Sequence, residues 1–167
     1  QGVFGCREMP ALSSRVSMFY VALMNDRLRR VQLAWLRLWL DEALQESHEL
    51  ERVQLLREVI AGYHDGLRDS PPDDTAAVFL AREGKNLDVS HQNKVLEWMR
   101  MRQTTPDKNK ADWWCMDIFI DDSFGGVFDF FAAAFKLVFT TVWQEFGIDV
   151  ADDKTEIVGD PKAVMQV

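Results

Sequence analysis

Cysteine and histidine are scarce in this sequence. Its 167 residues include two cysteines, Cys6 and Cys115, and three histidines, His48, His64 and His91. Two cysteines are too few for a disulfide framework, so the composition favours a reducing, intracellular compartment, either the cytoplasm or the nucleus. The histidines have no ligand spacing with one another or with cysteine, so we expect no zinc site.

Long apolar runs are also missing. A membrane-spanning helix needs about 18 or more consecutive apolar residues, and the best stretch here, residues 127–139, is interrupted by Asp129 and Lys136. We therefore expect no transmembrane helix and no membrane partner. No basic-then-apolar leader stands at the start, and the first residue is Gln1, so we expect the chain to be a piece of a longer protein or a processed product.

Basic residues are outnumbered by acidic ones. The 19 lysines and arginines oppose 27 aspartates and glutamates, and the net charge of −8 is unfavourable for gripping a nucleic-acid duplex. The charge alternates along the chain: +4 over residues 1–40, −7 over 41–81, +3 over 82–110 and −8 over 111–167. The 47% hydrophobic content argues against disorder, and the length suits one domain with a core.

The most informative stretch is residues 113–129, WWCMDIFIDDSFGGVFD. Aromatic and branched residues from Trp113 to Ile120 predict a strand, Asp121 and Asp122 predict a tight turn, and residues 123–128 predict a returning strand. Carboxylates at a hairpin tip can hold divalent metal, because Mg²⁺ and Mn²⁺ prefer hard oxygen ligands. Side chains alternate along extended backbone, so we expect Asp121 to be the main ligand and Asp122 an outer one. The alternative is a solvated turn without chemical role.

Three motifs resemble those of reverse transcriptases and stand in that family's order. Residues 119–122, FIDD, resemble the aromatic-x-Asp-Asp signature of these template-directed polymerases. Residues 4–10, FGCREMP, look like the F-G-x-x-x-x-P loop that opens the palm helix of retroelement enzymes. Residues 146–155, FGIDVADDKT, are similar to the segment in which a helix ends on glycine and a lysine precedes the last palm strand.

The resemblance implies an RNA-directed DNA polymerase of a retrotransposon, of which this chain is the C-terminal part of the palm domain. The expected fold class is α+β: a small antiparallel sheet with a carboxylate-tipped hairpin, backed by helices, plus a helical insertion. Asp121 and Asp122 become catalytic residues that hold the metal. Phe4, Gly5 and Pro10 are expected to shape the pocket for the nucleotide and the template.

The resemblance also implies a role for Lys154 and a set of binding partners. Lys154 is expected near the incoming triphosphate as proton donor to pyrophosphate, with a surface ion pair as the alternative. The expected partners are primer–template nucleic acid and dNTPs, bound by the complete enzyme. The family's first catalytic aspartate lies upstream of the F-G loop, so the N-terminal palm and fingers segment is missing. We expect the isolated chain to be inactive.

We expect three parts along the chain. Residues 1–40 hold the palm loop and a long helix, residues 41–110 form a helical insertion or connector, and residues 111–167 hold the hairpin, a helix and the C-terminal strands. Reverse transcriptases usually join the first helix to the hairpin by a much shorter segment. The helix and the hairpin must therefore pack as neighbours despite the insertion, which the slow growth of loop-closure entropy permits.

Periodicity and capping residues predict the remaining elements. Helices are expected over residues 11–40, 42–62, 91–103 with Ser90 as cap, and 130–146 with Gly147 as end; a linker over 68–74; short strands over 75–81, 148–151, 156–158 and 163–167; and a bulge or sharp exit at Gly125-Gly126. The arginines of the first helix either face solvent or contact template phosphates: Arg27, Arg29, Arg30 and Arg37.

Two alternative functions stay open. A fragment of an RNA-dependent RNA polymerase has the same kind of hairpin but incorporates ribonucleotides. A non-catalytic interaction module has apolar helices that bind partner helices, and its Asp-Asp turn is structural.

Overall fold

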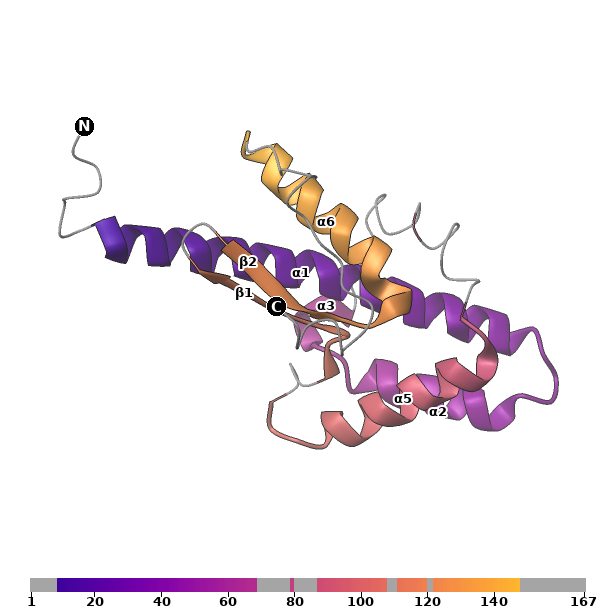
Figure 1. Cartoon of the computed structure of the whole chain (residues 1–167). Helices are drawn as coiled ribbons and strands as arrows, with labels where there is room; N and C mark the ends of the chain where they lie inside the picture. The colour runs from indigo at the N-terminus through magenta and orange to yellow at the C-terminus, as the bar shows by residue number, and fades with distance from the viewer. Residues whose placement is uncertain (1–8, 69–78, 80–86, 108–110, 120–121, 148–167) are drawn as a thin grey trace, which may run out of the picture.

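Helices dominate the structure, and a single hairpin forms its sheet (Figure 1). The computed structural model describes residues 9–68, 79, 87–107, 111–119 and 122–147, with the side chains of 9–14, 117–119 and 122–124 outside this description. Helices together with a two-stranded antiparallel sheet agree with the expected α+β class at that coarse level. Within the described residues, no helix is both long and apolar enough to cross a membrane.

The helix α1, Met9–Leu44, is the longest element. Its 36 residues span about 54 Å, and its apolar residues recur at threes and fours as the sequence predicts. The C-terminal part of this stripe is buried, at Leu28, Val31, Trp35 and Trp39. The N-terminal part is more exposed: Val16, Met18 and Phe19 are 44%, 69% and 56% exposed, although the Phe19 ring makes an edge contact with that of Phe146, with 6.0 Å between the centroids.

The predicted helix over residues 42–62 is divided. Residues 42–44 belong to α1, the chain turns over residues 45–49, and α2 runs over Leu50–Ala61. The turn is needed because α2 must fold back on α1 to bury Val53, Leu56 and Val59. A short helix, α3, follows at Asp65–Arg68.

The helix α5, Val89–Gln103, begins with a different cap from the one expected. Asp88, not Ser90, is the N-cap, and its carboxylate accepts the backbone N–H of His91 at 2.8 Å. Both residue types cap well, so the choice is set by which side chain reaches the free N–H groups. Phe79, the one described residue of the expected strand 75–81, is helical, and the alanines and leucine around it are strong helix formers.

The predicted hairpin is present, with a shifted turn. Strand β1 is Trp114–Phe119 and strand β2 is Asp122–Val127. Phe119 pairs with Asp122, so Asp122 begins β2 and does not lie in the turn. The pairing continues unbroken through Gly125 and Gly126 to Val127, so the expected bulge is absent. A Cβ on Gly125 would come within 2.0 Å of the Cys115 carbonyl oxygen, which explains glycine there without a bulge.

The last described helix is preceded by a short 3₁₀ turn. This turn, η3, is Asp129–Phe131, and α6 is Ala132–Glu145. Gly147 ends the helix as predicted: it has φ +72°, and its N–H donates to the Gln144 carbonyl oxygen at 2.9 Å. The strands expected beyond it lie outside the described residues.

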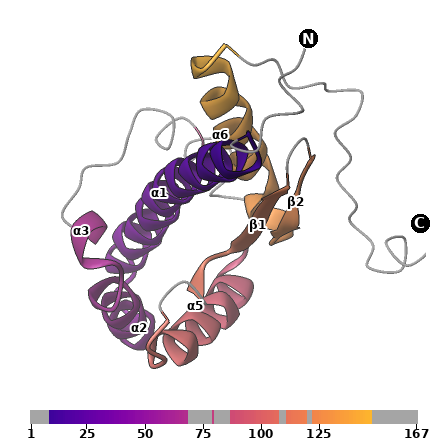
Figure 2. The same cartoon turned by 90° about the vertical axis from the view of Figure 1, so that its left-hand side faces the viewer.

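The helix α1 is the common support of the other elements. The helices α2 and α5 lie side by side near its C-terminal end, and the hairpin and α6 pack against its earlier turns (Figures 1 and 2). One apolar core connects all of them, running from Met24 on α1 through Leu56 on α2, Leu96 on α5 and Trp113 to Val142 on α6. The expected contact between the long helix and the hairpin is thus present across the insertion.

Candidate functional site

The hairpin that carries the acidic pair points toward the N-terminal end of α1. Asn25 of α1 is hydrogen-bonded to Trp114. Arg29, one turn further along α1, is hydrogen-bonded to Asp112, which stands two residues before Trp114. The strand β1 therefore runs antiparallel to α1. Its far end, where Phe119 pairs with Asp122, lies on the side of the helix that begins at Met9 (Figure 1).

Three polar residues of α1 hold the base of the hairpin. The indole Nε1 of Trp114 donates to Oδ1 of Asn25 at 3.0 Å, Arg29 Nη2 donates to Oδ2 of Asp112 at 3.1 Å, and Gln32 Nε2 donates to the Ala111 carbonyl oxygen at 3.1 Å. Asn25, Arg29 and Gln32 are spaced four and three residues apart, so they share one face of the helix. We call these three residues the polar row.

A second layer of polar groups supports the polar row from the end of α2. The Tyr63 hydroxyl donates toward Oε1 of Gln32 at 2.6 Å and also lies 3.0 Å from the Arg29 carbonyl oxygen. His64 Nε2 lies 4.0 Å from Oδ1 of Asp112. Burial is the largest influence on both acids: it raises the pKa of Tyr63 well above its ordinary value, and it raises the pKa of Asp112 although Arg29 acts to lower it.

Large aromatic side chains enclose the same end of the hairpin. The Trp113 ring centroid lies 5.5 Å from that of Trp39, 5.0 Å from that of Phe130 and 5.3 Å from that of Phe131. Trp35, Trp39, Trp113 and Phe131 are each at most 1% exposed. Each buried aromatic pair of this kind contributes about 0.5–1.5 kcal/mol to stability in addition to the effect of the apolar area that it buries. The base of the hairpin is therefore firmly packed.

The predicted site residues fall largely outside the described part of the chain. Phe4, Gly5, Asp121 and Lys154 lie there entirely. Pro10 is described only through its backbone, in the first turn of α1.

Asp122 is likewise described only through its backbone, as the first residue of β2. Among the described side chains, no group of three or more His, Cys, Asp or Glu is placed to hold a metal ion. Magnesium binding at Asp121 and Asp122 therefore stays a prediction.

Four arginines of α1, Arg27, Arg29, Arg30 and Arg37, have protein partners. Arg27 makes two hydrogen bonds to Glu145 on α6, at 2.8 and 2.6 Å, and these hydrogen bonds lower the pKa of that carboxyl group, with the guanidinium charge acting in the same direction. Arg30 donates to Asp26 at 3.0 Å, and Arg37 donates to the carbonyl oxygen of Arg68. Arg27, Arg37 and Arg29 thus join α1 to α6, to α3 and to the start of the hairpin, whereas the pair of Arg30 lies within α1.

The polar row was missed from the sequence. Its partners stand 79 to 89 residues away along the chain, and no local pattern identifies such pairs. The one available signal was Gln32, a polar residue within the apolar stretch from Val31 to Trp35. A buried glutamine requires hydrogen-bond partners, and here they are Ala111 and Tyr63.

Comparisons with protein-family profiles, with curated proteins and with solved structures give no match to this chain.

Proposed function

We propose that the chain is part of a reverse transcriptase palm, which adds deoxynucleotides to a primer 3′ end under the direction of a template. The observation that supports this most is the hairpin: β1 ends at Phe119 and β2 begins at Asp122, the first and last residues of the FIDD motif. The hairpin also packs along the long helix α1. The order of the elements also agrees: an F-G motif before a helix, then the acidic hairpin, then a helix that ends on glycine.

The proposed roles follow from the chemistry of the residues. Asp121 and Asp122 would hold Mg²⁺ or Mn²⁺ through carboxylate oxygens, together with an aspartate from an upstream segment. The bound metal would stabilise the charge that develops on the attacking and leaving oxygens. Phe4, Gly5 and Pro10 would shape the nucleotide and template pocket, and Lys154 would supply a proton to the leaving pyrophosphate.

The described residues contribute rigidity to this function. Two-metal chemistry needs carboxylates held within a fraction of an ångström, so a hairpin that carries them must be fixed at its base. The polar row holds residues 111, 112 and 114 by hydrogen bonds, and the aromatic residues around Trp113 hold the same segment by packing.

Primer extension by the protein that includes its upstream palm segment tests the proposal. We expect Asp121→Asn to lower extension at least about a hundredfold, because the substitution removes a charge from the reacting centre. Asp129→Asn is the matched control, since Asp129 is exposed just beyond the other end of the hairpin. Unchanged extension by Asp121→Asn would refute the metal assignment, and preference for ribonucleotides over dNTPs would indicate an RNA polymerase.

A direct binding experiment needs only this chain. In NMR spectra, Mg²⁺ or Mn²⁺ should perturb the amide signals of Asp121 and Asp122, and Asp121→Asn should abolish the effect. A pair of carboxylates without its third ligand binds weakly, so titration must extend to millimolar metal.

The second candidate function is a non-catalytic interaction module. The observation that favours it is the exposed apolar side of α1 at Val16, Met18 and Phe19, since exposed apolar patches mark interaction sites. For such a module, Asp121→Asn leaves function unchanged, whereas Phe19→Ser weakens partner binding.

A further inference from the structure

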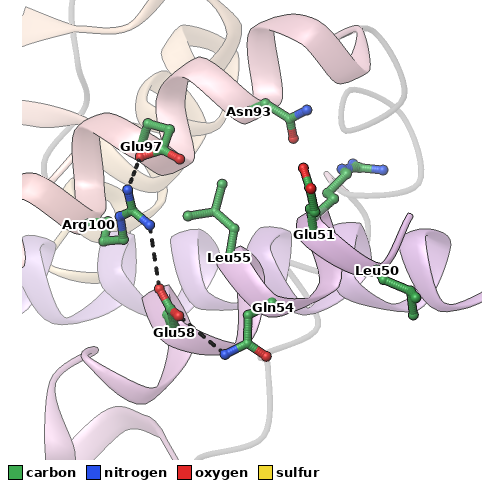
Figure 3. Close-up of a pocket in the computed structure, with 9 residues that line it drawn as sticks. Leu50, Glu51, Gln54, Leu55, Glu58, Asn93, Glu97 and Arg100 are labelled. Carbon is green, nitrogen blue, oxygen red and sulfur yellow. Dashed lines mark hydrogen bonds and ion pairs between the residues drawn. The ribbon is translucent and has the colours of Figure 1, made fainter. Parts of the chain in front are cut away.

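A groove of about 540 Å³ lies between α2 and α5 (Figure 3). Leu55 rises from α2 into the space between the helices, and Asn93, Glu97 and Arg100 reach it from α5. Leu50, at the start of α2, lies at its edge and is 76% exposed. The groove belongs to the segment for which the sequence predicted no role.

The charged side chains of the groove leave an acidic excess. Arg100 is shared between two carboxylates, Glu97 at 2.6 Å and Glu58 at 3.7 Å. Arg52 is paired with Glu49, which is not part of the lining. The lining thus holds three carboxylates, Glu51, Glu58 and Glu97, against two arginines, Arg52 and Arg100, a net charge of −1.

Two acceptor groups face each other across the groove without a donor. Oδ1 of Asn93 is buried and has no hydrogen-bond partner. In Figure 3 it points toward the Glu51 carboxylate on the opposite helix. Within the described residues Glu51 itself makes no hydrogen bond or ion pair. Glu51 is exposed at the mouth of the groove, so the buried unpaired acceptor of this pair is Asn93 Oδ1. An unpaired buried acceptor is costly, so this position is suited to a ligand that donates a hydrogen bond.

We propose that this groove binds an arginine or lysine side chain of a basic peptide segment on a partner protein. A cationic N–H group satisfies Asn93 Oδ1 and Glu51 at once, and the excess negative charge attracts it. A divalent ion fits poorly, because Ca²⁺ and Mg²⁺ take about six or more oxygen ligands, whereas the facing pair supplies one carboxylate and one amide. The exposed Leu50 provides an apolar surface for a neighbouring residue of the peptide.

Calorimetric titration of the whole chain with a short synthetic peptide of arginine and leucine tests the proposal. The matched probe carries citrulline in place of each arginine, which keeps the shape and removes the charge. We expect the arginine peptide to bind and the citrulline peptide to bind at least about tenfold more weakly, in line with loss of a charge-assisted hydrogen bond. Glu51→Gln should weaken the arginine peptide similarly, while Glu46→Gln, exposed and outside the groove, should not.

Asn93→Asp provides an independent check. A second carboxylate should strengthen binding of the arginine peptide if Asn93 Oδ1 contacts the cation. Unchanged binding, or weaker binding together with lower thermal stability, would mean that the Asn93 amide instead donates to Glu51, and would overturn the proposal. Equal binding of both peptides would also overturn it, as would spermine binding as tightly as the peptide with the same dependence on Glu51.

Discussion

The carboxylate of Asp112 is largely buried. Its side chain is 8% exposed, and Arg29, 18% exposed, bonds both carboxylate oxygens, at 3.5 and 3.1 Å. Burial raises the pKa of Asp112 in the folded protein more than Arg29 lowers it. Folding therefore favours the protonated form of Asp112: its contribution to stability is present at low pH and is lost as the pH rises through the folded-state pKa, and Arg29 reduces that loss by pairing with the carboxylate.

Removal of Arg29 should reveal this dependence. We expect Arg29→Met to lower the free energy of unfolding by about 2–3 kcal/mol near pH 7, because it leaves a buried carboxylate without its partner. The loss should shrink as the pH falls through the raised pKa of Asp112, since a protonated Asp112 needs no cation. Urea unfolding followed by tryptophan fluorescence measures both values. Arg30→Met is the control, because its ion pair with Asp26 is more exposed and the change should stay within about 0.5 kcal/mol.

At the scale of the elements, β2 tolerates a side chain at one glycine and not at its neighbour. A Cβ at Gly125 would stand 2.0 Å from the Cys115 carbonyl oxygen, which is backbone and cannot rotate away. A Cβ at Gly126 would meet only the Cys115 sulfur at 3.4 Å, an ordinary contact. Both positions are glycine, but a side chain is excluded only at Gly125.

Alanine substitution tests this difference. We expect Gly125→Ala to destabilise the protein by about 1–3 kcal/mol, because the strands must separate to admit the methyl group. Gly126→Ala should cost far less. Thermal unfolding gives the comparison, and equal losses for the two variants would show that the hairpin does not hold this register.

The start of α5 offers a second test at this scale. The backbone N–H of His91 is the largest cause of the lowered pKa of Asp88, followed by the His91 side chain. Because the folded-state pKa is lowered, the cap's contribution is present above the ordinary aspartate pKa and is lost as the pH falls through the folded value. We expect Asp88→Ala to accelerate hydrogen exchange at His91 near neutral pH, whereas Ser90→Ala should leave it unchanged. The reverse result would identify Ser90 as the cap.

At the scale of the whole molecule, local signals in the sequence were sufficient for the longest helix, the hairpin and the last helix, and insufficient for their contacts. Apolar periodicity predicted α1, and the glycine at position 147 predicted the end of α6. The cap of α5 was misplaced because Asp88 and Ser90 are both suitable by type, and Asp122 was placed in the turn because aspartate suits turns. The pairing of Phe119 with Asp122 puts Asp122 in β2, and no local pattern indicates such a pairing.

The charge of the whole chain leads to one further expectation. The net charge is −8, and four arginines of α1, Arg27, Arg29, Arg30 and Arg37, are engaged with Glu145, Asp112, Asp26 and a backbone carbonyl group. We therefore expect this chain alone to bind a primer–template duplex no more tightly than non-specific binders do, with a Kd of about 10⁻⁶ M or weaker at physiological salt. Fluorescence anisotropy provides the measurement. A nanomolar Kd would show that a basic surface exists elsewhere in the chain.

The segment between Leu44 and Ala111 leaves α1 at its C-terminal end and returns to the same helix at Gln32. Both of its attachment points are therefore fixed by one rigid body, and its length does not decide where the hairpin lies. A change in the length of the connections within this segment therefore leaves the hairpin in place, whereas loss of its helices would uncover the core at Leu56 and Leu96.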